Sequence, residues 1–364
     1  MNPVIPAPVP VPLPAPAWLL QFLLVFTFIL HVLPMNFLLG GTVILTLSGF
    51  LGCKRSRHRE LAVRAARALP PVVAFTITLG VAPLLFLQLV YGQLFYTSSV
   101  LMAWFWLAVV FLVLIGYYGV YWFNMQQDEL GPRARWVMLG TALVFVLVAL
   151  IFSRNMSFML RPEEFYVSFL KHKVGLILGP VGAADIARPL HFIVGSLAVA
   201  GLGLAILSRT WSREAPDLAV WARRYGVKWF MGATAVQIFV GLWFLTSLPV
   251  GIRHLFLGGD ALATAILVAA IALALVAMMT ALRNLALGGA CLVGTLVLMA
   301  VIRHLVRVAY LRPYFDPRAL PVEGQWVVFT LFALLLVAGL ATVGWMLWKF
   351  FLPGSARAAS GQAG

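Results

Sequence analysis

Nine long apolar runs alternate with short breaks of charged, glycine or proline residues along this chain. Each run approaches or exceeds the roughly 20 apolar residues that a helix needs to cross a bilayer. The runs lie at about 18–50, 69–91, 100–124, 135–153, 190–208, 228–247, 261–281, 285–302 and 326–348. The pattern predicts an all-α integral membrane protein whose single domain, residues 18–350, is a bundle of nine transmembrane helices.

Composition supports this prediction and excludes a soluble enzyme. The 364 residues are 63% hydrophobic and 10% charged, with a mean hydropathy of +1.00, whereas a soluble domain is about half apolar. The net charge of +15 does not require a nucleic acid partner, because Lys and Arg orient membrane proteins. The two cysteines, Cys53 and Cys291, form no C-x-x-C-H motif for covalent haem attachment.

The two ends of the chain differ from the apolar domain. Residues 1–17 contain seven prolines and no charge, which predicts an extended outer arm, and residues 351–364 read as a disordered tail. An odd number of crossings places the ends on opposite sides. Sixteen of the 26 Lys and Arg residues fall on the side of segment 54–67. We therefore expect an outside N-terminus and a cytoplasmic C-terminus in a bacterial or archaeal cytoplasmic membrane.

Histidines supply the candidate chemistry, because none of the eleven acidic residues falls inside a helix core. Five of the six histidines fall on the expected outer half: His31, His172, His191, His254 and His304. Imidazole is a common ligand of haem iron, and haem sites in bundles use ligands from facing helices. The alternative is that each histidine only bonds a backbone carbonyl or a lipid headgroup, which is our interpretation of the sixth, His58.

Arginines accompany these histidines along the chain: Arg188, Arg253, Arg303 and Arg307. A haem carries two propionates, and the arginine fork pairs with carboxylates. The alternative is that these side chains reach toward lipid phosphates.

Two segments carry a family resemblance: QFLLVFTFILHVLPMNFLLGG (21–41) in the first apolar run and ITLGVAPLLFLQLVYGQ (77–93) in the second. They are similar to the first and second helices of subunit I of the cytochrome bd quinol oxidases, in a short and divergent form. The resemblance implies that His31 binds a haem at the oxygen-reducing site, and Gln88 stands where the family has a glutamate.

Two further matches imply more haem ligands. SRNMSFML (153–160) and the segment 169–201 resemble the family's outer stretch and fifth helix, which gives His191 the role of low-spin haem ligand. In RHLVR, His304 and Arg307 occupy the spacing of a family Glu-x-x-Arg, and His254 beside Arg253 is the nearest substitute for a missing methionine ligand. The resemblance implies one to three haems b and a quinone.

The departures from this family favour electron transfer over oxygen chemistry. Gln88 cannot exchange protons as a carboxylate does, and the family's quinol loop shrinks to about 248–260. We expect a haem-b subunit of a multi-subunit respiratory complex that passes electrons between quinone and an outer redox partner, such as a periplasmic cytochrome. A minimal quinol oxidase and a haem-free transporter or scaffold are the alternatives.

Basic residues of the outer segments form a candidate docking patch for that partner, with ordinary solvated loop charge as the alternative. They are Arg154, Arg161, Lys171, Lys173, Arg312 and Arg318.

Overall fold

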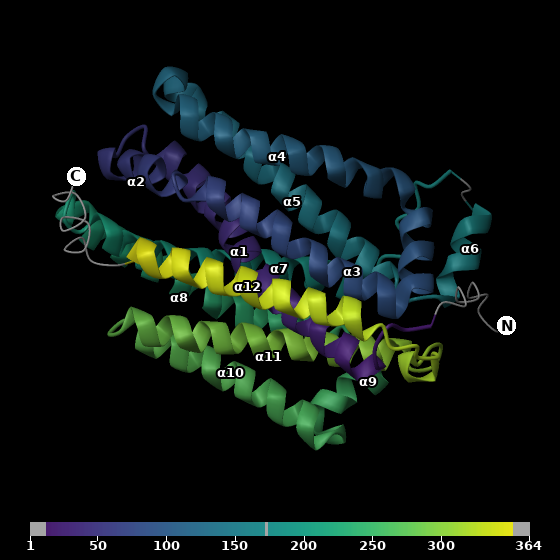
Figure 1. Ribbon diagram of the computed structural model, residues 1–364. Coiled ribbons are helices and arrows are strands. Elements are labelled where there is room, and N and C mark those ends of the chain that lie inside the picture. Colours follow the sequence, from purple (N-terminus) through teal and green to yellow (C-terminus); the bar gives the residue numbers. More distant parts are fainter. Residues whose placement is uncertain (1–11, 172–173, 352–364) are drawn as a thin grey trace.

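The computed structural model describes residues 12–171 and 174–351, and in these ranges the regular elements are helices. Nine are long and apolar enough to cross a membrane, which confirms the predicted all-α, multi-pass class (Figure 1). They are α1 (Ala17–Leu51), α3 (Leu69–Leu101), α4 (Ala103–Leu130), α5 (Ala134–Phe158), α7 (Ala183–Leu207), α8 (Pro216–Thr246), α10 (Ala261–Ala281), α11 (Leu285–Leu311) and α12 (Trp326–Phe351).

Three short helices lie at the ends of the bundle. α2 (Ser56–Ala66) is at the end where α12 finishes, and α6 (Glu163–Lys171) and α9 (Val250–His254) are at the end where α1 begins. We name these the α2 end and the α6 end. α1 starts and α12 finishes at opposite ends, as nine crossings require, while the orientation of these ends in a membrane remains a prediction.

The helices extend beyond the apolar runs that predict them. α8 begins at Pro216 rather than near residue 228, and α11 continues to Leu311 rather than ending near residue 302. Charged residues at a membrane boundary still form helix, since their long side chains reach water while the backbone bonds continue. Segment 54–67, a charged break between two of the apolar runs, is mostly the helix α2.

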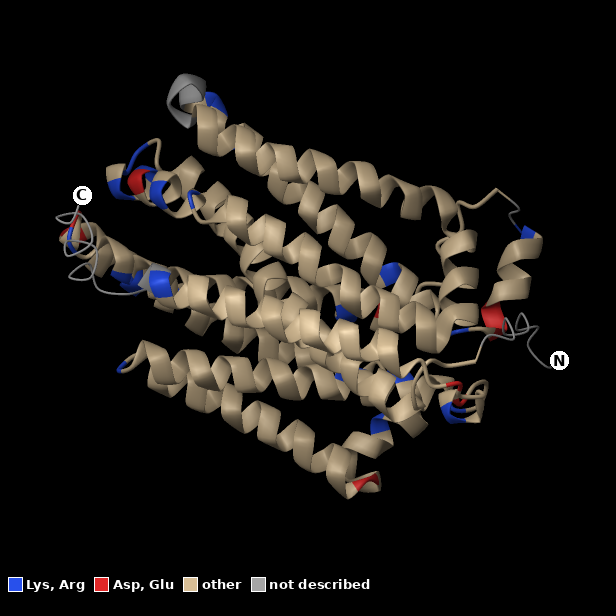
Figure 2. Cartoon of the chain, in the orientation of Figure 1, with Lys and Arg blue, Asp and Glu red and all other residues tan. Residues whose placement is uncertain are grey.

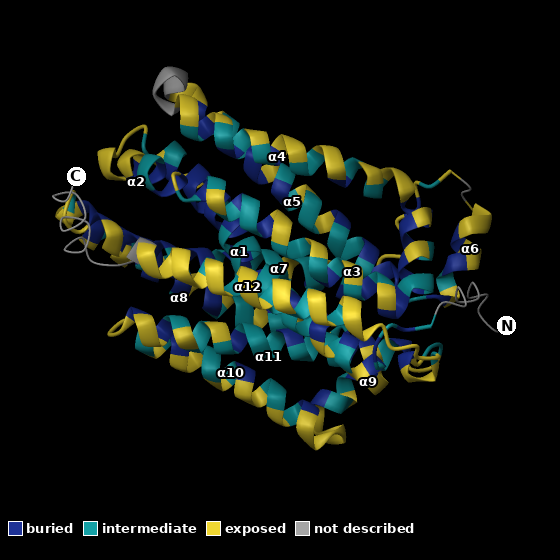
Figure 3. Cartoon of the chain, viewed as in Figure 1, coloured by how far each residue is buried: buried dark blue, intermediate teal, exposed yellow. Residues whose placement is uncertain are grey.

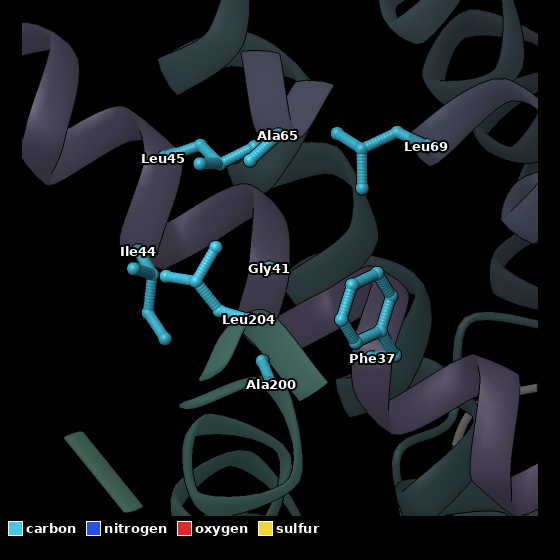
Figure 4. A pocket seen from close by; sticks show the side chains of 8 residues that line it. All are labelled: Phe37, Gly41, Ile44, Leu45, Ala65, Leu69, Ala200 and Leu204. Carbon is cyan, nitrogen blue, oxygen red and sulfur yellow. The ribbon is translucent and has the colours of Figure 1, made fainter. Parts of the chain in front are cut away.

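α1 and α7 cross at the centre of the bundle, with the α4–α5 pair on one side and the α10–α11 pair on the other (Figure 1). At the crossing, the Cα of Gly40 meets the backbone of Ser196 so closely that a Cβ would overlap the Ser196 carbonyl. Small residues permit such contacts between membrane helices. Beside the crossing, Phe37, Leu45, Leu69 and Leu204 converge and leave a gap of only about 10 Å³ (Figure 4).

α12 lies apart from this core. None of its most apolar stretch is buried (Figure 3), and Phe332 meets Phe86 of α3 edge to face at 5.5 Å. The residues before α1 are bonded to the segment before α12, because Leu13 N donates to Pro321 O at 2.8 Å and Glu323 N donates to Leu13 O at 2.9 Å. Residues 1–11, which make up most of the expected arm, and residues 352–364 lie outside the described ranges.

Candidate functional site

His191 lies in the third turn of α7 and faces α8. A Cβ placed on Gly241 of α8 would be 3.0 Å from His191 Cε1, and the ring lies against Phe244 with centroids 6.3 Å apart. The Nδ1 atom is buried and has no hydrogen-bond partner among the described residues. Most buried polar atoms are satisfied, so this imidazole is a candidate for binding a group that the protein alone does not supply.

His304 on α11 shares this property and has a charged neighbour on each side. Its Nδ1 is also buried without a partner among the described residues. Arg303 places its guanidinium 4.3 Å from the ring centroid of Phe28 on α1, and Arg307, which is 5% exposed, lies 5.6 Å from that of Tyr91 on α3. In the part of the chain that the structure describes, neither guanidinium has a carboxylate partner. Arg307 is therefore buried, and Arg303 partly buried, without a carboxylate partner among the described residues, which is costly for a cation.

Arg188 of α7 completes this cluster of arginines. It donates to Ser157 Oγ at 2.9 Å and lies 5.4 Å from the Phe244 ring that packs on His191. Arg303 is within electrostatic reach of both Arg188 and Arg307. Arg188, Arg303 and Arg307, which we call the arginine triad, therefore concentrate positive charge beside His191 and His304.

His31 differs from the other two histidines because its orientation is fixed. Its Nδ1 lies 3.0 Å from the backbone carbonyl of Thr76 on α3. A carbonyl only accepts, so Nδ1 carries the proton and Nε2 keeps its lone pair. This is the arrangement that orients metal-ligating histidines. Gly80 leaves room for the ring, and Arg303 acts on it electrostatically, which links His31 to the triad.

Three predicted site residues make no hydrogen bond, ion pair or ring contact with these histidines. His254 is exposed at the end of α9, where Gly259 packs against its ring. Arg253 donates to the Thr246 carbonyl at 3.1 Å, and Gln88 accepts from the Tyr96 hydroxyl at 3.3 Å. The roles of Arg253, His254 and Gln88 therefore remain predictions from the sequence.

The protein atoms alone do not form a multi-ligand metal site. Among the described residues, no three His, Cys, Asp or Glu side chains converge on one point. The histidines of this region could instead hold a group whose metal takes one or two imidazole nitrogens, and the triad could pair with the acidic groups of that molecule.

Sequence reasoning missed an ion-pair network at the start of α7. The Asp185 side chain, 3% exposed, forms an ion pair with Arg154, whose Nη1 lies 2.9 Å from a carboxylate oxygen, and accepts a hydrogen bond from Arg161. It also accepts from the backbone N–H of Gly182 at 2.8 Å and so caps the helix. The only signal in the sequence is an acidic residue in the first turn of a predicted helix.

This network changes the interpretation of the expected docking patch. Arg154 and Arg161 are bonded to Asp185, and Arg318 is paired with Asp316 at 2.9 Å. Lys173 and its neighbour His172 lie outside the described residues. Of the patch, only Lys171 and Arg312 are described as exposed and have no ion pair with a described residue.

Comparison with known proteins identifies a similar fold but no matching family. No family model matches the chain, and no curated protein matches it either. Among solved structures, a chain of the bd oxidase from Geobacillus thermodenitrificans is similar with a TM-score of 0.63, at 14% identity, over 94% of this chain and 99% of that chain. The chain has a bd-oxidase-like fold. The coverage makes the two chains nearly equal in length, and identity this low establishes the architecture alone.

Proposed function

We propose that the chain is a haem-b electron-transfer subunit of a membrane respiratory complex, which passes electrons between quinone and an outer redox partner. The observation that carries this proposal is that His191 and His304, whose buried Nδ1 atoms have no partner among the described residues, lie beside the arginine triad, in which Arg303 and Arg307 have no described carboxylate partner. A haem has the complementary chemistry, since its iron takes imidazole nitrogen and its propionates pair with arginine forks.

The described residues fit such a group in three respects. His191 and His304 have buried Nδ1 atoms without partners, His31 presents a free Nε2, and Arg303 and Arg307 lack carboxylate partners. A bound haem b supplies one-electron redox chemistry. The chain's own residues would bind the iron, neutralise the propionates and exclude water with the rings of Phe28, Tyr91 and Phe244.

A quinol oxidase that reduces oxygen is the second candidate, and the fold similarity to a bd oxidase favours it. Oxygen reduction needs protons at the site, and carboxylates usually deliver them at depth. The buried carboxylate beside this region, Asp185, is held by two arginines. The electron-transfer role therefore agrees better with the described residues.

Two measurements on the purified full-length chain test these functions. A pyridine haemochrome assay should reveal haem b, and its absence would leave the haem-free transporter or scaffold. Oxygen uptake with reduced quinol, together with carbon monoxide binding to the reduced protein, should both be negligible. Rapid uptake with a carbon monoxide-shifted spectrum would instead establish the oxidase.

A further inference from the structure

α2 is an amphipathic helix that lies at one end of the bundle. Its 11 residues extend about 16 Å, roughly half of a hydrocarbon core of about 30 Å, so it cannot span the membrane. One face is packed against the bundle, and its buried residues are His58, Leu61, Ala62, Ala65 and Ala66. The other face carries arginines.

Contacts with three helices fix the orientation of α2. The His58 ring meets Trp221 at 4.8 Å and Tyr225 at 5.2 Å, both on α8 and both edge to face. Asn124 of α4 donates to the Ala66 carbonyl at 2.8 Å, and Ala65 packs beside Leu45 of α1 (Figure 4). The basic face is therefore presented outward on a helix that is held in place.

Nearby carboxylates neutralise only one arginine of this segment. Arg64 pairs with Glu60 at 3.1 Å and with Glu214 at 3.2 Å. The remaining basic residues are exposed and form no ion pair with any described residue: Lys54, Arg55, Arg57, Arg59 and Arg67. α8 adds the exposed Arg223, Arg224 and Lys228 at the same end, where Figure 2 shows basic positions gathered.

We propose that the basic face of α2 binds the phosphate headgroups of anionic phospholipids in the adjoining leaflet. A cluster of Lys and Arg residues beside the ends of transmembrane helices is typical of binding to anionic headgroups, and the guanidinium fork matches phosphate geometry. Orientation of the chain in the membrane requires only an excess of Lys and Arg on one side. It does not require these charges on one anchored helix and its flanks, where the one carboxylate, Glu60, is already paired with Arg64.

The test compares lipid selectivity in two variants that lose the same charge. One carries Arg57→Gln, Arg59→Gln and Arg67→Gln on α2 and its end. The control carries Lys171→Gln, Arg312→Gln and Arg318→Gln, all exposed at the α6 end. Each full-length protein is reconstituted with phosphatidylglycerol and phosphatidylcholine, and the retained lipids are counted by native mass spectrometry. A melting curve of each variant shows that it is folded.

The wild type and the control should retain phosphatidylglycerol preferentially. Because each charge near an anionic surface contributes about fivefold, the α2 variant should lose at least tenfold of that preference. Equal lipid retention by all three proteins, or an equal loss in both variants, overturns the proposal. Displacement of the lipid by millimolar inorganic phosphate would also overturn it, since the site would then be a phosphate site. None of these readouts depends on haem.

Discussion

His31 Nδ1 on α1 donates to the backbone carbonyl of Thr76 on α3 at 3.0 Å, and Gly80 one turn further along α3 leaves the space for the ring. The proton on Nδ1 makes Nε2 the free nitrogen of this histidine. A similar space exists at His191, where Gly241 of α8 takes the place of Gly80.

Filling these spaces should displace the histidines. A Cβ at position 80 would lie 2.9 Å from His31 Cε1, and one at position 241 would lie 3.0 Å from His191 Cε1. We expect Gly80→Ala and Gly241→Ala each to shift or weaken part of the haem absorption. Gly232→Ala on α8 is the matched control, because nothing lies within 4 Å of its Cβ. An unchanged spectrum in both site variants would contradict haem binding by these histidines.

Replacing Arg303 and Arg307 by glutamine should have opposite effects on haem retention and on the stability of haem-free protein. Charge-assisted hydrogen bonds contribute about 1.5–3 kcal/mol each, so each replacement should speed haem loss about tenfold or more. Haem-free protein should become more stable, because an uncompensated buried charge is removed. Haem transfer to apomyoglobin and thermal melting measure the two effects. Destabilised haem-free protein with unchanged haem retention would show that the triad has no anion to bind.

Asp185→Asn should destabilise the α6 end. Removing one partner from a buried ion pair costs about 3–5 kcal/mol, and Arg154 and Arg161 would both lose their carboxylate. The apparent melting temperature should fall clearly. Asp316→Asn is the control, because Asp316 and Arg318 are exposed and surface pairs contribute little. Equal melting of the two variants would contradict the structural role of Asp185.

His58 should make stability depend on pH. Burial, with a smaller effect of Arg55, lowers the pKa of His58 below its ordinary 6.5. The unfolded chain therefore binds the proton more readily, and the stability from neutral His58 is complete above pH 6.5 and decreases as pH falls below it. The slope cannot exceed about 1.4 kcal/mol per pH unit for one proton. His58→Gln should remove it in melts at pH 7.5 and 5.5, and should leave any haem spectrum unchanged. A slope equal to that of the wild type would contradict this assignment.

The sequence predicts the nine spans because their length and apolar content follow directly from the bilayer. The sequence also contains the helical period of α2, although the charge of the segment obscures it. This period is the spacing of the buried residues His58, Leu61, Ala62, Ala65 and Ala66. Contacts between distant segments are not available from one sequence.

The candidate site, too, could be predicted from the sequence only where its residues are neighbours along the chain or stand out by residue type. The sequence pairs Arg303 and Arg307 with His304 because they are neighbours, and it singles out His31 and His191. It could not place Arg154 on Asp185, which is 31 residues away, because that contact depends on how α5, α6 and α7 pack.

The most direct measurement of the central claim is the reduced-minus-oxidised visible spectrum of His191→Ala beside the wild type, with His58→Ala as the control. The account predicts a b-type band in the wild type, loss of its low-spin component in His191→Ala with helix content retained, and an unchanged band in the control because His58 packs on Trp221 and Tyr225 at the α2 end. A wild type without the band, or a His191→Ala variant that keeps the whole band, would contradict it.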